Sequence, residues 1–101
     1  MQKILLCCSA GMSTSLLVER MKKVAAERSL TVEIEAIPVA DFESRIDEAA
    51  VVLLGPQVRY KLTAFKQVAD AKGKPIEVID MMAYGMVNGA QVLDQALALI
   101  A

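Results

Sequence analysis

Short apolar runs alternate with stretches of helical periodicity along this chain. Residues 31–37 alternate apolar positions with Glu33 and Glu35, which indicates an edge strand with one exposed side. Residues 51–54 contain no polar side chain, as is typical of a central parallel strand covered on both faces. Apolar runs at residues 4–7 and 76–79 complete a set of four predicted strands.

A helical stretch follows each predicted strand, with apolar residues three and four positions apart. The four predicted helices run from Leu16 onward, from an N-cap at Asp41 to about residue 47, from Val58 to near Ala71, and along a last core stripe from Leu93 to Ile100. Residues 80–89 are predicted as a loop. Right-handed crossovers then place helices on both faces of a four-stranded parallel sheet, so the predicted fold class is α/β.

The length and composition limit what this chain can be. It has 101 residues, of which 55% are hydrophobic, so we predict a single domain over residues 1–101. No apolar run approaches the ~18 residues that span a bilayer. Residues 8–15 interrupt the first apolar run too early for a signal peptide, and we therefore predict a cytoplasmic protein.

The chain contains no histidine, and its two cysteines are adjacent. Adjacent cysteines cannot build an ordinary disulfide framework, and reduced thiols fit a reducing compartment. The net charge of -1 predicts no nucleic-acid binding surface. Without histidine the chain lacks the usual general base and the commonest metal ligand, so we predict no metal and no cofactor.

The segment after the first strand has the composition of an anion-binding loop. It reads Cys8-Ser9-Ala10-Gly11-Met12-Ser13-Thr14-Ser15 and leads directly into the first predicted helix. We call residues 8–15 the Cys8 loop. Free backbone N–H groups and the positive end of a helix dipole stabilise a thiolate and bind phosphate. The sequence therefore predicts phosphorus chemistry on a sulfur atom.

The two cysteines are expected to have different roles. In an extended strand Cys7 and Cys8 project to opposite sides, so only one of them can face the loop. The glycine and hydroxyl residues follow Cys8, which makes Cys8 the candidate nucleophile and Cys7 a small buried hydrophobe. Ser13 or Thr14 could also cap the first helix, which is compatible with phosphate binding.

Three ordered blocks give the chain a resemblance to a known family. They are the Cys8 loop, then Leu53-Leu54-Gly55-Pro56-Gln57 with Tyr60, and then Val78-Ile79-Asp80 with Tyr84-Gly85 and Gly89. Over nearly its whole length the chain resembles an enzyme IIB component of the bacterial phosphoenolpyruvate-dependent sugar phosphotransferase system, in the lactose, cellobiose and chitobiose family. The resemblance implies a fold like that of low-molecular-weight tyrosine phosphatases.

The resemblance also implies a phosphotransferase that works as a carrier. A phosphohistidine on a IIA protein would phosphorylate Cys8, and the phosphate would pass to a β-linked disaccharide, such as cellobiose, chitobiose or lactose, held by the membrane component IIC. By position, Cys8 is the phosphorylated residue and the phosphate is held by Ser9, Ala10, Gly11, Met12, Ser13, Thr14 and Ser15. Contact with IIC would bring this cytoplasmic protein to the membrane.

Other residues are predicted to lie near the same site. The predicted strands end at Cys8, Gly55 and Asp80, and ligands in parallel sheets bind at such carboxyl ends. Partner or mouth contacts are therefore predicted for Gln57, Tyr60, Asp80 and Tyr84. Flexible, apolar docking contacts are predicted for Met12, Met81, Met82 and Met86. Because a donor and an acceptor must approach Cys8 in turn, we expect a shallow and largely uncharged surface there.

A cysteine phosphatase is the main alternative. Such an enzyme needs an arginine six positions after the thiol, where this chain has Thr14, and Arg20 lies more than a turn further along the helix. Without histidine, attack by water would lack general-base help worth roughly 10²- to 10⁴-fold, so a phosphocysteine should persist. An arsenate-reductase-like enzyme would need a resolving cysteine after Cys8, and none occurs. In a pure binding module the thiol would be dispensable.

Overall fold

A four-stranded parallel sheet forms the centre of the molecule, as the sequence predicts. The structure is a computed structural model that describes residues 2–9 and 12–100, with side chains from residue 14 onward in the second stretch. The strands stand in the order β2-β1-β3-β4, with the bounds β1 Gln2–Cys8, β2 Val32–Pro38, β3 Val51–Leu54 and β4 Ile76–Val78. The predicted edge strand is β2, and all four residues of the central strand β3 are buried.

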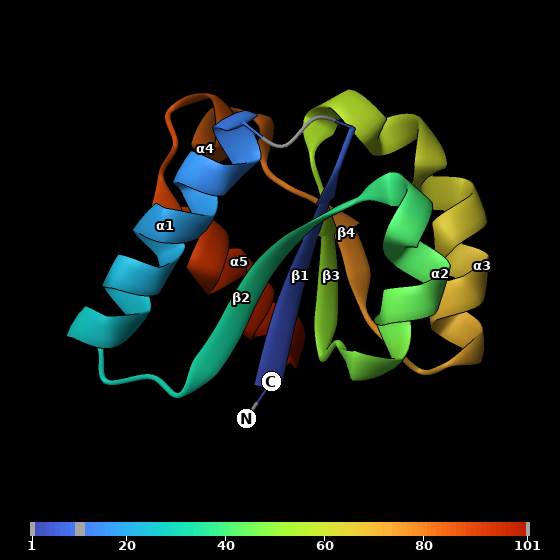
Figure 1. The fold of residues 1–101 in the computed structure, drawn as a ribbon, viewed down its shortest axis with the longest axis horizontal. Coiled ribbons are helices and arrows are strands. Elements are labelled where there is room, and N and C mark those ends of the chain that lie inside the picture. The colour runs from blue at the N-terminus through green and yellow to red at the C-terminus, as the bar shows by residue number, and fades with distance from the viewer. Residues whose placement is uncertain (1, 10–11, 101) are drawn as a thin grey trace.

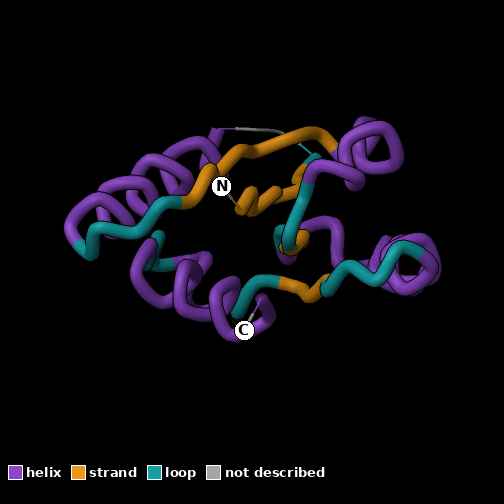
Figure 2. Tube along the Cα trace, turned by 90° about the horizontal axis from the view of Figure 1, so that it is seen from below, coloured by secondary structure: helices purple, strands orange, loops and turns teal. Residues whose placement is uncertain are grey.

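Helices cover both faces of this sheet. The described chain contains the α-helices α1 Met12–Glu27, α2 Phe42–Arg45, α3 Leu62–Ala71, α4 Met81–Gly85 and α5 Gly89–Ile100, and the 3₁₀ helices η1 Val39–Asp41, η2 Ile46–Glu48 and η3 Pro56–Lys61. In Figure 1, α1 and α5 lie on one side of the sheet, and α2 and α3 lie on the other. Figure 2 shows the strands between these two helical layers.

Each face of the sheet has its own hydrophobic core because successive strand residues point to opposite faces. Ile4, Leu6, Val51 and Leu53 pack with Leu17 and Met21 of α1 and with Val92, Leu93 and Ala96 of α5. Leu5, Cys7, Val52 and Leu54 pack with Phe42, Ile46, Phe65 and Ala69 on the other face. The unbroken apolar sequence of β3 follows from this arrangement, since its residues serve the two cores alternately.

The first helix begins earlier than its apolar stripe indicates. We predicted a helix from Leu16 onward, whereas α1 starts at Met12 and takes in the last four residues of the Cys8 loop. Serine and threonine favour caps and turns over helix interiors, so their presence argued for loop. In the first turn this preference costs little, because the N–H groups there have no partner within the helix in any case.

The segment predicted as a loop from residue 80 to residue 89 contains a helix, so that prediction is wrong. The carboxylate of Asp80 accepts a hydrogen bond from the backbone N–H of Ala83 at 2.9 Å, and this cap starts α4. The backbone N–H of Tyr84 also donates to the carbonyl of Asp80 at 2.9 Å. A helix of five residues is too short to show a periodic apolar stripe, which is why the sequence pattern missed it.

Two further helix predictions need correction. The stripe from Val58 to Ala71 is not one helix: η3 comes first, with a kink at Val58 (φ -115°, ψ 21°), and α3 then ends at Ala71 as predicted. Asp41 stands at the N-cap position of α2, but its side chain makes no capping hydrogen bond. Its carbonyl oxygen instead accepts a hydrogen bond from the hydroxyl of Ser44 at 3.0 Å.

Candidate active site at the carboxyl end of the sheet

Cys8 lies where β1 separates from the central strand. Its neighbour Cys7 is the last residue of β1 to pair with β3, and Cys8 itself pairs only with Pro38 of β2. The backbone N–H of Gly55 donates to the carbonyl of Cys7 at 2.8 Å and closes the end of the pairing. A methyl group on Gly55 would lie 3.7 Å from the Cβ of Cys8, so the glycine lets the backbone after β3 pass close to this cysteine.

The two cysteines differ as predicted. Cys7 has no exposed surface and belongs to the core that also contains Leu5 and Leu54. Burial, reinforced by the nearby Cys8, raises the pKa of Cys7 to about 12, so its thiol stays protonated at neutral pH. Cys8 is also buried, with 3% of its surface exposed, but it borders a pocket of about 240 Å³. Cys7 therefore faces a hydrophobic core, and the adjacent Cys8 faces a pocket.

The pocket beside Cys8 is small and contains no formal charge. Its lining consists of Cys8, Ser9, Ser15, Ala36, Ile37 and Pro38. The first two and Ser15 belong to the Cys8 loop, and the other three form the end of the edge strand β2. This small, uncharged lining agrees with the surface expected from the sequence.

The amino end of α1 supplies the dipole that the sequence analysis anticipated. The first turn of the helix runs from Met12 to Ser15, and its N–H groups have no acceptor within the helix. Ser15 belongs to this turn and also lines the pocket beside Cys8. Ala10 and Gly11 lie outside the described residues, as do the side chains of Met12 and Ser13, so their phosphate-binding roles stay predictions.

Thr14 faces the protein interior. Its side chain has no exposed surface, and its Oγ1 lies 3.1 Å from the hydroxyl oxygen of Tyr84 on α4. The Nε2 of Gln57 on η3 donates to the same tyrosine oxygen at 3.0 Å. From the sequence, Gln57 and Tyr84 could be grouped only by their nearness to strand ends. The contact of Tyr84 with Thr14 could not be predicted, because the two residues are 70 positions apart and no local pattern indicates it.

Asp80 and Tyr60 occupy different positions from these three residues. Asp80 follows β4, but its carboxylate caps α4, and its backbone N–H donates to Oε1 of Gln95 at 3.0 Å. Its observed role is to start a helix. Tyr60, on η3, exposes 70% of its surface and is therefore available to a partner rather than to the Cys8 pocket.

Three methionines are exposed on and beside α4. Met81 and Met82 open this helix, and Met86 follows its last residue. Their exposed fractions are 59%, 74% and 71%, unusual values for side chains of this size and polarity. Exposed methionines can adapt to the shape of a docking protein. They lie at the same end of the sheet as Cys8 because α4 follows the carboxyl end of β4.

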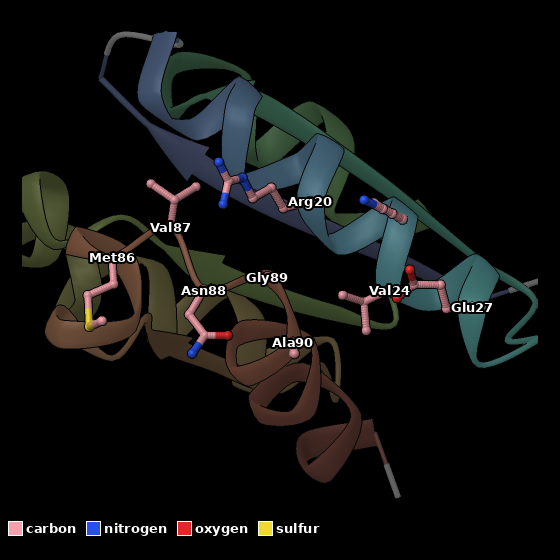
Figure 3. A pocket seen from close by; sticks show the side chains of 9 residues that line it. Arg20, Val24, Glu27, Met86, Val87, Asn88, Gly89 and Ala90 are labelled. Atoms are coloured by element: carbon pink, nitrogen blue, oxygen red, sulfur yellow. The ribbon is translucent and has the colours of Figure 1, made fainter.

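A larger hollow of about 680 Å³ lies elsewhere, between α1 and the connection from α4 to α5 (Figure 3). Its lining includes Arg20 and Val87 but no residue of the Cys8 loop. Arg20 lines this hollow and is absent from the lining of the Cys8 pocket. At the edge of this hollow, Gly89 packs so closely on α1 that a Cβ there would lie 2.7 Å from the carbonyl carbon of Arg20.

Residues 2–9 and 12–100 include no cluster of three or more side chains suited to hold a metal ion. Within the same stretches, every helix is either too short or too polar to cross a bilayer.

Comparison with known proteins relates this geometry to one family. The family described as "PTS system, Lactose/Cellobiose specific IIB subunit" matches residues 3–95. The chain is 44% identical over 100 residues to the oligo-β-mannoside-specific EIIB component of the PTS system of Bacillus subtilis (strain 168), covering 99% of this chain and 97% of that protein. It is 42% identical over 98 residues to the cellobiose-specific EIIB component of Lactococcus lactis subsp. lactis (strain IL1403), covering 92% and 91%.

Solved structures agree with this result. The cellobiose-specific phosphotransferase IIB component of Borrelia burgdorferi superposes with a TM-score of 0.82 at 40% identity, over 98% of this chain and 91% of that one. The lactose-specific IIB domain of Streptococcus pneumoniae has a TM-score of 0.89 at 19% identity, over 99% and 98%, and supports the fold alone. The predicted fold, like that of low-molecular-weight phosphatases, is thereby confirmed.

Proposed function

The chain belongs to the lactose/cellobiose-specific IIB family of the sugar phosphotransferase system, a family of phosphotransferases, and we propose that Cys8 is its phosphoryl carrier. The observation that supports Cys8 most directly is its contrast with Cys7. Cys8 borders the uncharged pocket at the end of β1, with 3% of its surface exposed, whereas Cys7 lies within a hydrophobic core and its thiol is held protonated. The first turn of α1 also offers backbone N–H groups without a partner in the helix, and such groups bind phosphate.

The proposed reaction has two in-line steps. The thiolate of Cys8 attacks the phosphorus of a phosphohistidine on a IIA protein, so a P–S bond forms as the P–N bond breaks and the imidazole leaves with the donor. A sugar hydroxyl then attacks the same phosphorus, and the P–S bond breaks to regenerate the thiolate. The hydroxyl proton passes to a base on the acceptor side, since this chain has no histidine. Backbone N–H groups at the start of α1 stabilise the charge on the transferring oxygens.

The composition of the site supports a carrier over a phosphatase. No described residue that lines the Cys8 pocket is a general base, and the carboxylate of Asp80, which follows β4, caps α4. Thr14 occupies the position where a cysteine phosphatase needs an arginine, and it is buried against Tyr84. A phosphocysteine in this pocket lacks the groups that would activate water, so it persists until an acceptor arrives.

The proposed partners are a cytoplasmic IIA protein as donor and a membrane IIC protein with bound sugar as acceptor. Both must reach Cys8, so they use the same surface in turn, and the exposed methionines of α4 together with Tyr60 are its proposed apolar contacts. Two relatives are named for oligo-β-mannoside and cellobiose, which supports a β-linked disaccharide, such as cellobiose, chitobiose or lactose, as the proposed sugar. The protein would then be cytoplasmic and would associate with the membrane through IIC.

Intact-mass spectrometry tests the carrier directly. Wild type, Cys7→Ser and Cys8→Ser are incubated at mildly alkaline pH with a phosphohistidine-bearing IIA protein. We expect one phosphate adduct on wild type and on Cys7→Ser and none on Cys8→Ser. An adduct that survives in Cys8→Ser would overturn the assignment. Absence of any adduct, together with hydrolysis of an aryl phosphate, would identify a phosphatase instead.

A further inference from the structure

Thr14 is unusual among the described side chains. It is the one polar residue among them that is fully buried, and it stands in the first turn of α1, within the Cys8 loop that is proposed to hold the phosphoryl group. A buried hydroxyl is costly unless it is hydrogen-bonded. The contact of 3.1 Å between its Oγ1 and the hydroxyl of Tyr84 meets this requirement.

Tyr84 joins three segments that follow three different strands. Thr14 lies on α1 after β1, Gln57 lies on η3 after β3, and Tyr84 lies on α4 after β4. The tyrosine oxygen accepts a hydrogen bond from Nε2 of Gln57 at 3.0 Å and also contacts Oγ1 of Thr14. One phenol group therefore connects the carboxyl-end connections of three neighbouring strands.

We propose that Tyr84 is a positioning residue for the Cys8 loop, which it orients through the hydroxyl of Thr14. This inference rests on the proposed function of Cys8 and gives it a structural support. The first turn of α1 contains the N–H groups that stabilise the thiolate and the phosphoryl oxygens. The neutral hydrogen bond between Thr14 and Tyr84 fixes this turn and so holds its N–H groups in place. It adds no charge that would compete with the phosphate.

The size of the expected effect follows from the geometry of transfer. Displacement of a positioning group by about 1 Å can cost roughly 10²-fold in rate, and loss of one hydrogen bond at the start of a helix allows a smaller displacement. We therefore expect Tyr84→Phe, which keeps the ring and removes the hydroxyl, to slow transfer to Cys8 roughly tenfold.

Two assays on the full chain test this proposal. The first measures single-turnover transfer from phosphorylated IIA to Cys8 by intact mass. The second measures alkylation of Cys8 by iodoacetamide across pH in the Cys7→Ser background, which reports thiolate formation and needs no partner protein. We expect Tyr84→Phe to slow transfer and to move the alkylation profile to higher pH. Thr63→Val, which removes an exposed hydroxyl from α3, is the control and should change neither result.

Substitutions at Thr14 show whether Tyr84 acts through this residue. Thr14→Val removes the hydroxyl and keeps the shape, whereas Thr14→Ser restores a hydroxyl. We expect Thr14→Val to reproduce the Tyr84→Phe result and Thr14→Ser to recover most of the wild-type behaviour. Combining Tyr84→Phe with Thr14→Val should add little to either single change, because both break the same connection.

The outcomes separate this proposal from the proposed function. If wild type takes no phosphate from IIA, the carrier function fails, and the alkylation profiles still decide whether Tyr84 positions the loop. If Tyr84→Phe matches Thr63→Val in both assays, the positioning role is wrong. If circular dichroism shows that Tyr84→Phe is unfolded, the comparison of Thr14→Val with Thr14→Ser takes its place, and equal behaviour of these two variants overturns the proposal.

Discussion

The two ends of the sheet are held together by different kinds of interaction. At the amino end, Nζ of Lys3 lies 3.5 Å from Glu33, 3.3 Å from Glu35 and 2.6 Å from Glu48. Arg45 contacts Glu35 and Glu48 at 2.6 Å each. This network joins the starts of β1 and β2 to η2 and α2. The pKa values of Glu35 and Glu48 are lowered, and that of Glu48 falls to about 2, because Arg45 and then Lys3 hydrogen-bond to it.

At the carboxyl end, neutral groups make the corresponding connections. Thr14, Tyr84 and Gln57 are linked by uncharged hydrogen bonds, and the Cys8 pocket contains no formal charge. Fixed ion pairs are acceptable where the charge never changes. A site that gains and then loses a phosphoryl group must accommodate two charge states, so orienting contacts there are better made by neutral groups. The comparison indicates that the amino end supports the fold and the carboxyl end supports the reaction.

The largest expected effect comes from crowding the carboxyl end. In Gly55→Ala the new methyl group would lie 2.9 Å from Oε1 of Gln57 and would displace that side chain from Tyr84. We expect transfer to Cys8 to fall roughly tenfold, as for other changes that misplace the loop. The free energy of unfolding should change by about 1 kcal/mol or less, because the obstructing atom ends a flexible side chain.

Gly85→Ala is the matched control for that substitution. A Cβ at Gly85 would meet no atom within 4 Å, so this variant should keep both its transfer rate and its stability. Single-turnover transfer and urea unfolding measure the two properties. If Gly55→Ala transfers phosphate as fast as Gly85→Ala, close approach of the backbone to Cys8 is unimportant.

A smaller effect is expected from a charge placed on the exposed surface of α4. Met82→Asp should raise the IIA concentration needed for half-maximal transfer roughly fivefold, a change that corresponds to about 1 kcal/mol of binding free energy. Alkylation of Cys8 should be unchanged, since Met82 is exposed and is proposed to contact the partner rather than the loop. Gln67→Asp adds the same charge to exposed α3 and serves as the control. Equal results for both variants would place the docking surface elsewhere.

The smallest effect on transfer is expected at the amino end. The pKa of Glu48 is lowered on folding, so this carboxylate stabilises the folded state above its ordinary pKa of roughly 4.3, and the contribution is lost as pH falls toward about 2. Glu48→Gln should therefore lower the melting temperature at pH 7, and the difference from wild type should shrink between pH 4 and pH 2. Transfer to Cys8 at pH 7 should stay unchanged.

Thermal unfolding at several pH values checks this prediction. Glu43→Gln provides the comparison, because it removes an exposed carboxylate from α2 that takes part in no ion pair described by the structure. A pH-independent difference between wild type and Glu48→Gln would show that the ion pairs do not account for the stability of this end. Loss of transfer in Glu48→Gln would contradict the division between the two ends.

The strands could be predicted because their signals are local, and local signals also make Cys8 the candidate nucleophile. Val51–Leu54 contains only apolar residues since both faces of β3 are covered, and the acidic positions of β2 mark an exposed edge. The choice of Cys8 over Cys7 followed from strand alternation and from the residues that come next. Helix α4 could not be predicted because five residues are too few to show the apolar periodicity of a helix. Its start also depends on one capping contact by Asp80.

The sequence by itself determined the family, the α/β order of the elements and Cys8 as the candidate nucleophile, since each depends on residues close together in the chain. Only the tertiary structure decided which side chains support the loop. Thr14 was expected to face a phosphate and is instead buried against Tyr84, 70 positions away. Asp80 was expected at the mouth of the site, and the structure adds that its carboxylate caps α4. A polar side chain can satisfy its hydrogen bonds with any partner that folding brings near, and the packing of distant segments selects that partner.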